Sequence, residues 1–392
     1  MPDFRIGLLF STTGPYAALG RSARDGAVMA LEEVNRSGRI NLVADIADPC
    51  GIPGEYERLA GEMVTSGAIN HIVGGITSWS RKDMIPVLER HGGMLWYPCP
   101  YEGFETSDHV VYLGACPNQH LLPILDHVAD RLPRKAFLVG SNYVWGWETL
   151  RISRQHLVTK GIEVSGERYL PLGEIAIDHL MAEIAAYRPD VIVNSLIGPS
   201  NHAFMQALAA LQPEPHKAER QEAETEARDS VVVSANQTEA DLDALGPAAE
   251  GMISIAAWFE TVADVATAEL RARVAARYGV GYRASCNFAT AYAAVHLLAG
   301  GLEAAGRDDA RAVFDAVAGI EHDTVLGRIA IDPVSRHTAL IPRLATVRGG
   351  AFEIVADPGI SLAPDPYLSR VTARPFTQDR KHTHTPNLRI VS

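Results

Sequence analysis

The stretch FRIGLLF at residues 4–10, followed by the turn TGP at residues 13–15, decides the fold expected for this chain. Its apolar residues run almost without interruption, which is typical of a strand buried on both faces of a parallel sheet. The next segment spaces its apolar residues as one face of a helix does, at Ala27, Ala30, Leu31 and Val34. A buried strand, a turn and an amphipathic helix form the first half of a βαβ unit.

The same alternation continues along the 392 residues, a length that predicts two domains. Further strands are expected at residues 41–46, 69–73, 94–97, 110–113, 135–140, 164–170, 191–194, 230–234 and 251–255. Helices are expected at residues 56–66, 82–90 (started by a capping box at Ser80), 121–132, 147–160, 267–278 and 288–305. This pattern predicts an α/β fold of two Rossmann-like lobes with mostly parallel sheets. The expected lobes are residues 1–120 with 256–332, and residues 121–255 with 333–367, before a tail at 368–392.

Composition narrows the classes of partner. The formal net charge of −12 argues against nucleic acid or an anionic membrane as a direct partner. The four cysteines show no metal-ligand spacing, which favours free thiols, although their even number also permits a disulfide. The first predicted strand begins three residues after Met1, and no run of 18 apolar residues suggests a membrane span. We therefore expect a cytoplasmic protein, or a periplasmic one if a leader has been removed.

Two segments depart from the α/β pattern. Residues 213–229 are polar and Glu-rich, which predicts a solvated loop that is partly disordered. The tail beyond Tyr367 is basic and carries His382 and His384. Two histidines near a terminus do not make a metal site, so we expect neither a metal nor a cofactor there.

Sequence motifs for catalysis are missing. The chain contains no GxSxG, HExxH, Walker A or GxGxxG pattern. Cys99 and His109 could form a thiol–imidazole pair, but a lone cysteine at a strand end is more often a packing residue. We expect a binding protein and no enzyme.

The loops that follow the predicted strands carry the candidate ligand site, because ligands of open parallel sheets bind beyond the carboxyl ends of the strands. These loops are rich in aromatic, hydroxyl and amide side chains and poor in charge, which suits a small uncharged polar solute. Ser78 should stand at a helix N-terminus, where free backbone N–H groups can donate to a carbonyl. Glu102 could accept from an amide NH₂ or brace its own loop. Tyr97, Tyr143 and Trp145 could enclose the solute or only pack between the lobes.

These residues resemble the type I periplasmic-binding-protein family, in particular its amide- and urea-binding branch. The resemblance rests on IGLLFSTTG (6–14), SWSRK (78–82), YPCPYEGFE (97–105), PNQ (117–119), VGSNY (139–143), YLPLG (169–173), NSLIG (194–198) and PDPY (364–367), so it covers nearly the whole chain. It implies two lobes joined by three crossovers, with a hinge that closes on the ligand. The ligand contacts that it implies are Ser78, Tyr97, Cys99, Pro100, Tyr143 and Trp145, with Asn236 or Gln237 from the second lobe.

Three positions depart from the amide sensors of that branch. Ile76 and Trp145 stand where those sensors have tyrosine, and Cys99 stands where they have threonine. Acetamide itself is therefore in doubt, and the ligand stays open between short amides and urea. The resemblance implies a cytoplasmic sensor that holds an RNA-binding antitermination regulator inactive. The alternatives are the substrate receptor of a urea or amide ABC transporter, and a branched-chain amino-acid receptor. A homo-oligomer is the default expectation.

Overall fold

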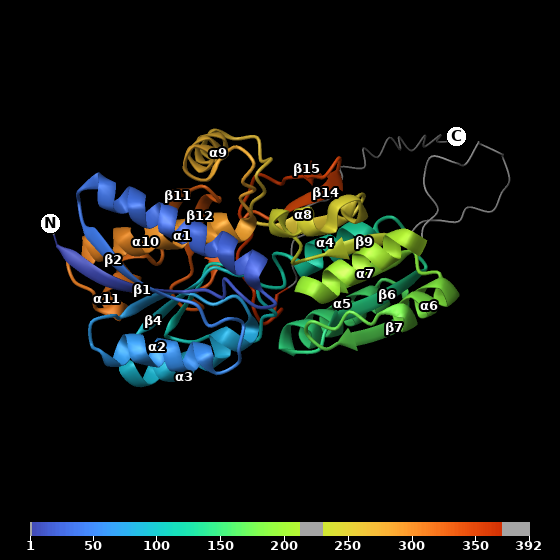
Figure 1. Ribbon diagram of the computed structural model, residues 1–392, viewed down its shortest axis with the longest axis horizontal. Coiled ribbons are helices and arrows are strands. Elements are labelled where there is room, and N and C mark those ends of the chain that lie inside the picture. Colours follow the sequence, from blue (N-terminus) through green and yellow to red (C-terminus); the bar gives the residue numbers. More distant parts are fainter. Residues whose placement is uncertain (1, 212–229, 371–392) are drawn as a thin grey trace, which may run out of the picture.

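The computed structural model describes residues 2–211 and 230–370, and Figure 1 shows two α/β lobes side by side. The segment 213–229 and most of the tail lie outside these residues. In the described ranges, no helix has both the length and the apolarity needed to cross a bilayer. The two lobes confirm the predicted α/β class.

The first lobe is built on a five-stranded sheet in the order β2-β1-β3-β4-β5, and every pair in it is parallel. Its strands are β1 (Asp3–Leu9), β2 (Asn41–Ala47), β3 (His71–Gly74), β4 (Met94–Tyr97) and β5 (Val110–Tyr112). Its helices are α1 (Ala17–Ser37), α2 (Glu55–Thr65), α3 (Ser78–His91), α9 (Val265–Tyr278), α10 (Cys286–Ala305) and α11 (Ala310–Val317). In Figure 1, α2 and α3 lie below this sheet, and α1 and α10 lie above it.

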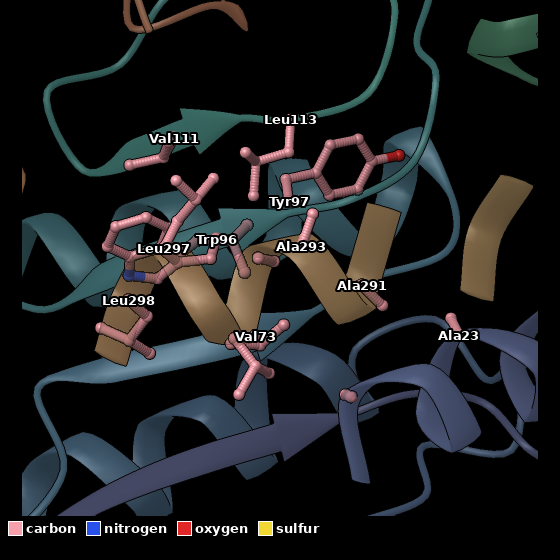
Figure 2. Packing of buried hydrophobic residues seen from close by; sticks show 14 of the residues in the cluster. Ala23, Val73, Trp96, Tyr97, Val111, Leu113, Ala291, Ala293, Leu297 and Leu298 are labelled. Atoms are coloured by element: carbon pink, nitrogen blue, oxygen red, sulfur yellow. The ribbon is translucent and has the colours of Figure 1, made fainter. Parts of the chain in front are cut away.

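Helix α10 is the centre of this lobe, because its sequence is apolar nearly all round and therefore suits a fully buried helix. Figure 2 shows Leu297 and Leu298 of α10 beside Trp96 and Val73 of the strands. Helix α1 packs closely on α10 at Gly26, where an added Cβ would lie 2.2 Å from the carbonyl oxygen of Phe288. Only a residue without a side chain allows that approach.

The second lobe is built on a seven-stranded sheet in the order β15-β14-β10-β9-β8-β6-β7. Its parallel strands are β6 (Lys135–Ser141), β7 (Glu163–Leu170), β8 (Val191–Ser195), β9 (Val231–Ser234) and β10 (Ile253–Ala256). β14 (Arg343–Arg348) and β15 (Ala351–Ala356) join the edge as antiparallel strands. The helices are α4 (Leu121–Ala129), α5 (Val144–Thr159), α6 (Asp178–Tyr187), α7 (Gly198–Leu211), α8 (Glu239–Leu245) and a 3₁₀ turn at Gly246–Ala249.

The sequence pattern did not predict the antiparallel pair β14 and β15, nor a small three-stranded sheet. That sheet consists of β11 (Glu321–Thr324), β12 (Gly327–Ile331) and β13 (Thr338–Ala339). β13 has only two residues and β11 is polar and half-exposed, so neither has the apolar run that marks a buried strand.

The chain passes three times between the lobes, from β5 to β6, from β10 to α9, and from β13 to β14. The predicted lobe limits at residues 120, 255 and 332 stay a prediction. The lobes also touch at Gly198, the first residue of α7. Its φ is +59°, and an added Cβ would lie 2.4 Å from the carbonyl oxygen of Pro15 in the first lobe.

Candidate functional site

A cavity lies where the carboxyl ends of the strands of the two lobes face each other. Its empty space is about 710 Å³, part of it open to solvent, and the centre of a water-sized sphere can reach about 50 Å³ of it. Both lobes and the segments that join them contribute to its wall. The lining residues are Leu19, Ile76, Thr77, Ser78, Pro98, Cys99, Pro100, Gly114, Ala115, His120, Tyr143, Trp145, Ile197, Ala235, Asn236, Thr238, Ile255, Ala256, Ala257, Cys286, Asn287 and Thr290.

The loop from β3 to α3 brings Ile76 and Ser78 to the cavity. Thr77 is the N-cap of α3: its Oγ1 accepts from the backbone N–H of Ser80 at 3.1 Å, and Ser80 Oγ accepts from that of Thr77 at 3.0 Å. The predicted helix start at Ser80 is therefore wrong, because this capping box lies three residues earlier. Ser78 becomes the first helical residue, where the backbone N–H groups have no partner within the helix.

Glu102 does not line the cavity, because its carboxylate is used inside the first lobe. Its Oε1 accepts from Arg81 Nη2 at 3.1 Å, and its Oε2 accepts from the hydroxyl of Ser78. The side chains of Arg81 and Glu102 are 0% and 2% exposed, so this is a fully buried ion pair. Of the two roles expected for Glu102, the contacts match the bracing of its own loop.

Arg81 is the centre of this buried network. Its Nε donates to Glu105 Oε1 at 2.5 Å, and its guanidinium lies 5.0 Å and 4.5 Å from the ring centres of Tyr97 and Tyr101. Burial would raise the pKa of Glu105, but the cations of Arg81 and Lys82 outweigh it and lower the pKa to about 2. Glu105 is therefore charged at neutral pH, and the network meets the cavity only at Ser78 among the described residues that line it.

Tyr97 and Gln237 were expected at the ligand, and neither lines the cavity. Tyr97 ends β4, is 1% exposed, and packs beside Leu113 and Ala293 (Figure 2). Gln237 uses its amide within the second lobe: its Oε1 accepts from Asn201 Nδ2 at 2.8 Å, and its Nε2 donates to the carbonyl of Leu196 at 3.3 Å.

The second lobe contributes Tyr143, Trp145 and Asn236 to the cavity. Tyr143 is the N-cap of α5, and its ring lies 5.1 Å from that of Trp79 in the first lobe. Asn236 Nδ2 donates to the carbonyl of Leu196 at 3.1 Å. These side chains close the cavity from the side opposite Ser78.

Cys99 and Pro100, which the resemblance implied as ligand contacts, line the cavity wall in the first lobe. The thiol of Cys99 donates to the carbonyl of Gly75 at 3.4 Å, and Asn287 Nδ2 donates to Cys99 Sγ at the same distance. Burial raises the pKa of Cys99 to about 12, so the thiol stays protonated. His109, its imagined partner, instead uses Nδ1 at 2.7 Å from the carbonyl of Gly93.

Several lining residues were missed in the sequence. Asn287 and Thr290 come from the first turns of α10, and His120 immediately precedes α4. Helical residues are not collected by a search of loops at strand ends. The available signal was polar Asn287 and Thr290, three residues apart and so on one face of an otherwise apolar helix.

Among residues 2–211 and 230–370, no Asp, Glu, Lys or Arg lines the cavity. Elsewhere in the part of the chain that the structure describes, no three His, Cys, Asp or Glu side chains gather as metal ligands. The cavity thus offers apolar surface, ring nitrogens, hydroxyls, amides and a helix N-terminus. Such a set can hold a small uncharged solute by hydrogen bonds and packing.

Comparison with known proteins identifies the family to which this architecture corresponds. A family model described as a periplasmic binding protein domain matches residues 4–373. A solute-binding protein of an ABC transporter from R. palustris, solved with benzoate, aligns with a TM-score of 0.81 at 17% identity, covering 93% of this chain and 98% of that one. A branched-chain amino acid binding protein from Streptococcus pneumoniae, solved with isoleucine, aligns with a TM-score of 0.77 at 17% identity, covering 92% and 99%.

Relatives found by sequence match either most of the chain at low identity or a short part of it at higher identity. The Leu/Ile/Val-binding protein homolog 6 of Brucella abortus is 25% identical over 352 residues, which cover 85% of this chain and 84% of that protein. A Leu/Ile/Val-binding protein of Rhizobium johnstonii is 34% identical over 99 residues, which span 24% of this chain and only 27% of that protein. These relatives are named for amino acids, so the comparisons do not single out an amide- or urea-binding branch.

Two expectations change with these findings. The match to a periplasmic binding protein model contradicts a cytoplasmic location and points to the periplasm. The antitermination regulator was expected partly because of that location, and the comparisons give it no support. The expectation of a non-catalytic protein is confirmed, because the matched family binds solutes.

Proposed function

This chain belongs to the periplasmic binding protein family, and we propose that it is the receptor of an ABC transporter for a small uncharged solute, a short amide or urea. The transporter role is supported by the R. palustris relative, whose fold it shares. The proposed solute differs from the solutes for which the relatives are named. The observation that supports this different solute is the uncharged lining of the cavity between the lobes.

An amino-acid ligand would need two opposite charges at the site, because burying an ammonium and a carboxylate without partners is costly. The buried charges of Arg81 and Glu102, which lie beside Ser78, neutralise each other within the first lobe. A carboxylate such as benzoate could use the N–H groups at the N-terminus of α3, but among the residues that the structure describes no lysine or arginine lines the cavity to neutralise it. An uncharged solute needs neither and can use the hydroxyls, amides and ring nitrogens that are present.

The cavity is narrow, because the centre of a water-sized sphere can reach only about 50 Å³ of it. Acetamide and urea are smaller than leucine and benzoate. They therefore need less movement of the lining side chains to fit.

The proposal is tested by thermal unfolding of the purified protein with acetamide, propionamide, urea, leucine or benzoate in large excess. A ligand present at 100 times its dissociation constant should stabilise the fold by about 2.7 kcal/mol, which raises the melting temperature measurably. A shift with an amide or with urea supports the proposal. A shift with leucine or benzoate alone would contradict it.

A further inference from the structure

Two buried ring nitrogens of cavity-lining residues have no hydrogen-bond partner among the described residues. They are Nε1 of Trp145 and Nδ1 of His120, and the two side chains belong to residues that are 3% and 1% exposed. Buried polar groups in folded proteins nearly always have a partner, so each such exception requires an explanation. A bound ligand that reaches both nitrogens would supply it.

The chemistry of the two nitrogens is complementary. His120 Nε2 lies 3.0 Å from the carbonyl oxygen of Tyr101, which can only accept, so Nε2 carries the proton. Burial lowers the pKa of His120 to about 4, and the ring is therefore neutral at pH 7. Nδ1 is then an acceptor with a free lone pair. The indole N–H of Trp145 can only donate.

The fold holds the two rings next to each other. Their centres are 5.7 Å apart and their planes are inclined by 40°. His120 precedes α4, on the first crossover between the lobes, and Trp145 lies in the first turn of α5. Helix α5 is fixed there because Gly146 approaches β6 closely: an added Cβ would lie 1.9 Å from the carbonyl oxygen of Ser141. This contact anchors the backbone beside Trp145, and the hydrogen bond to Tyr101 anchors the ring of His120.

We propose that His120 and Trp145 form an acceptor–donor pair that recognises one primary amide or urea group, with Trp145 Nε1–H donating to the carbonyl oxygen and His120 Nδ1 accepting from the neighbouring N–H. This inference rests on the proposed function and adds the residues that select the solute. A ketone offers the oxygen without the N–H. A carboxylate offers a second negative oxygen to Nδ1, which repels its lone pair.

Binding of acetamide, acetone and acetate, which have the same heavy-atom shape, tests this pair by calorimetry. His120→Gln can keep the donor to Tyr101 while removing the acceptor at Nδ1, and Trp145→Phe removes the donor. A lost hydrogen bond that leaves a buried partner unsatisfied weakens binding about tenfold. We expect each variant to weaken acetamide binding by about that factor. Acetone binding should respond to Trp145→Phe alone.

His109→Gln is the matched control, because His109 does not line the cavity. The melting temperature of every variant is measured without ligand, so that a loss of folding is seen separately. If the native protein binds acetamide or urea and both variants bind it unchanged, the pair is overturned and water fills the position. If the native protein binds leucine or benzoate and no amide or urea, the proposed function itself is overturned.

Discussion

Replacement of Arg81 by methionine is the strongest test of how this site is held together. The guanidinium is fully buried, pairs with Glu102 and Glu105, and stacks between Tyr97 and Tyr101. Methionine can fill the space but leaves the carboxylate of Glu102 buried without its cation. Breaking one side of a buried ion pair costs about 3–5 kcal/mol, a large part of the total stability of a typical protein.

Unfolding in guanidinium chloride followed by tryptophan fluorescence measures this loss, because urea is itself a proposed ligand. Arg5→Met is the matched control, because Arg5 and Asp45 also pair at 2.7 Å but their side chains are 51% and 38% exposed. An exposed pair contributes about 0–1 kcal/mol. The double variant Arg81→Met/Glu102→Gln removes both charges and should recover most of the loss.

The reasoning would be refuted if Arg81→Met destabilised the protein no more than Arg5→Met does. It would equally be refuted if the double variant were as unstable as the sum of the two single variants. Either result would mean that solvent reaches Glu102 or that another cation compensates it. Glu102 would then be available to a ligand after all.

Three further predictions concern stability and reactivity. The free energy of unfolding should fall as pH drops from about 6.5 to 4, because the unfolded chain binds protons in that range that the buried histidines of the folded protein do not. It is checked by unfolding in guanidinium chloride across that range. Burial lowers the pKa to about 4 in His71, His120 and His337. Each of these shifts can reduce the free energy of unfolding by up to about 3 kcal/mol at low pH. Gly26→Ala should cost at least 2 kcal/mol, because its Cβ would strike Phe288, whereas Gly61→Ala on α2 should be neutral or stabilising by about 1 kcal/mol in the same assay. Ellman's reagent should label Cys50 alone in the native protein and four thiols in urea, because the other three cysteines are buried.

The strands of the parallel sheets could be anticipated because uninterrupted apolar runs such as residues 4–10 have few alternatives in an α/β chain. The rule that ligands bind beyond the carboxyl ends of strands likewise placed Ser78, Cys99 and Trp145 at one cavity. β13 could not be found, because a two-residue strand is defined by its partner and has no pattern of its own. Such pairings depend on contacts that are distant in the sequence.

The expectation for Glu102 shows where local reasoning stops. A glutamate in a loop between strands can bind a ligand with its carboxylate only if no other residue is already paired with it. Arg81, which stands 21 residues earlier in the sequence, pairs with the Glu102 carboxylate, because α3 begins at Ser78 and places the Arg81 side chain beneath the loop. His120 was missed for a related reason: its free nitrogen matters only once the neighbouring carbonyl of Tyr101 is known to occupy the other one.

The contact between Gly198 and Pro15 affects how tightly this protein binds its solute, but not which solute it selects. The lobes meet there backbone to backbone, outside the set of residues that choose the solute. A side chain at position 198 would act as a wedge that disfavours the joined arrangement of the lobes. Apparent affinity scales with the fraction of molecules in the competent arrangement. Substitutions of graded size at this glycine would therefore tune the concentration to which a receptor or biosensor responds, without changing its selectivity.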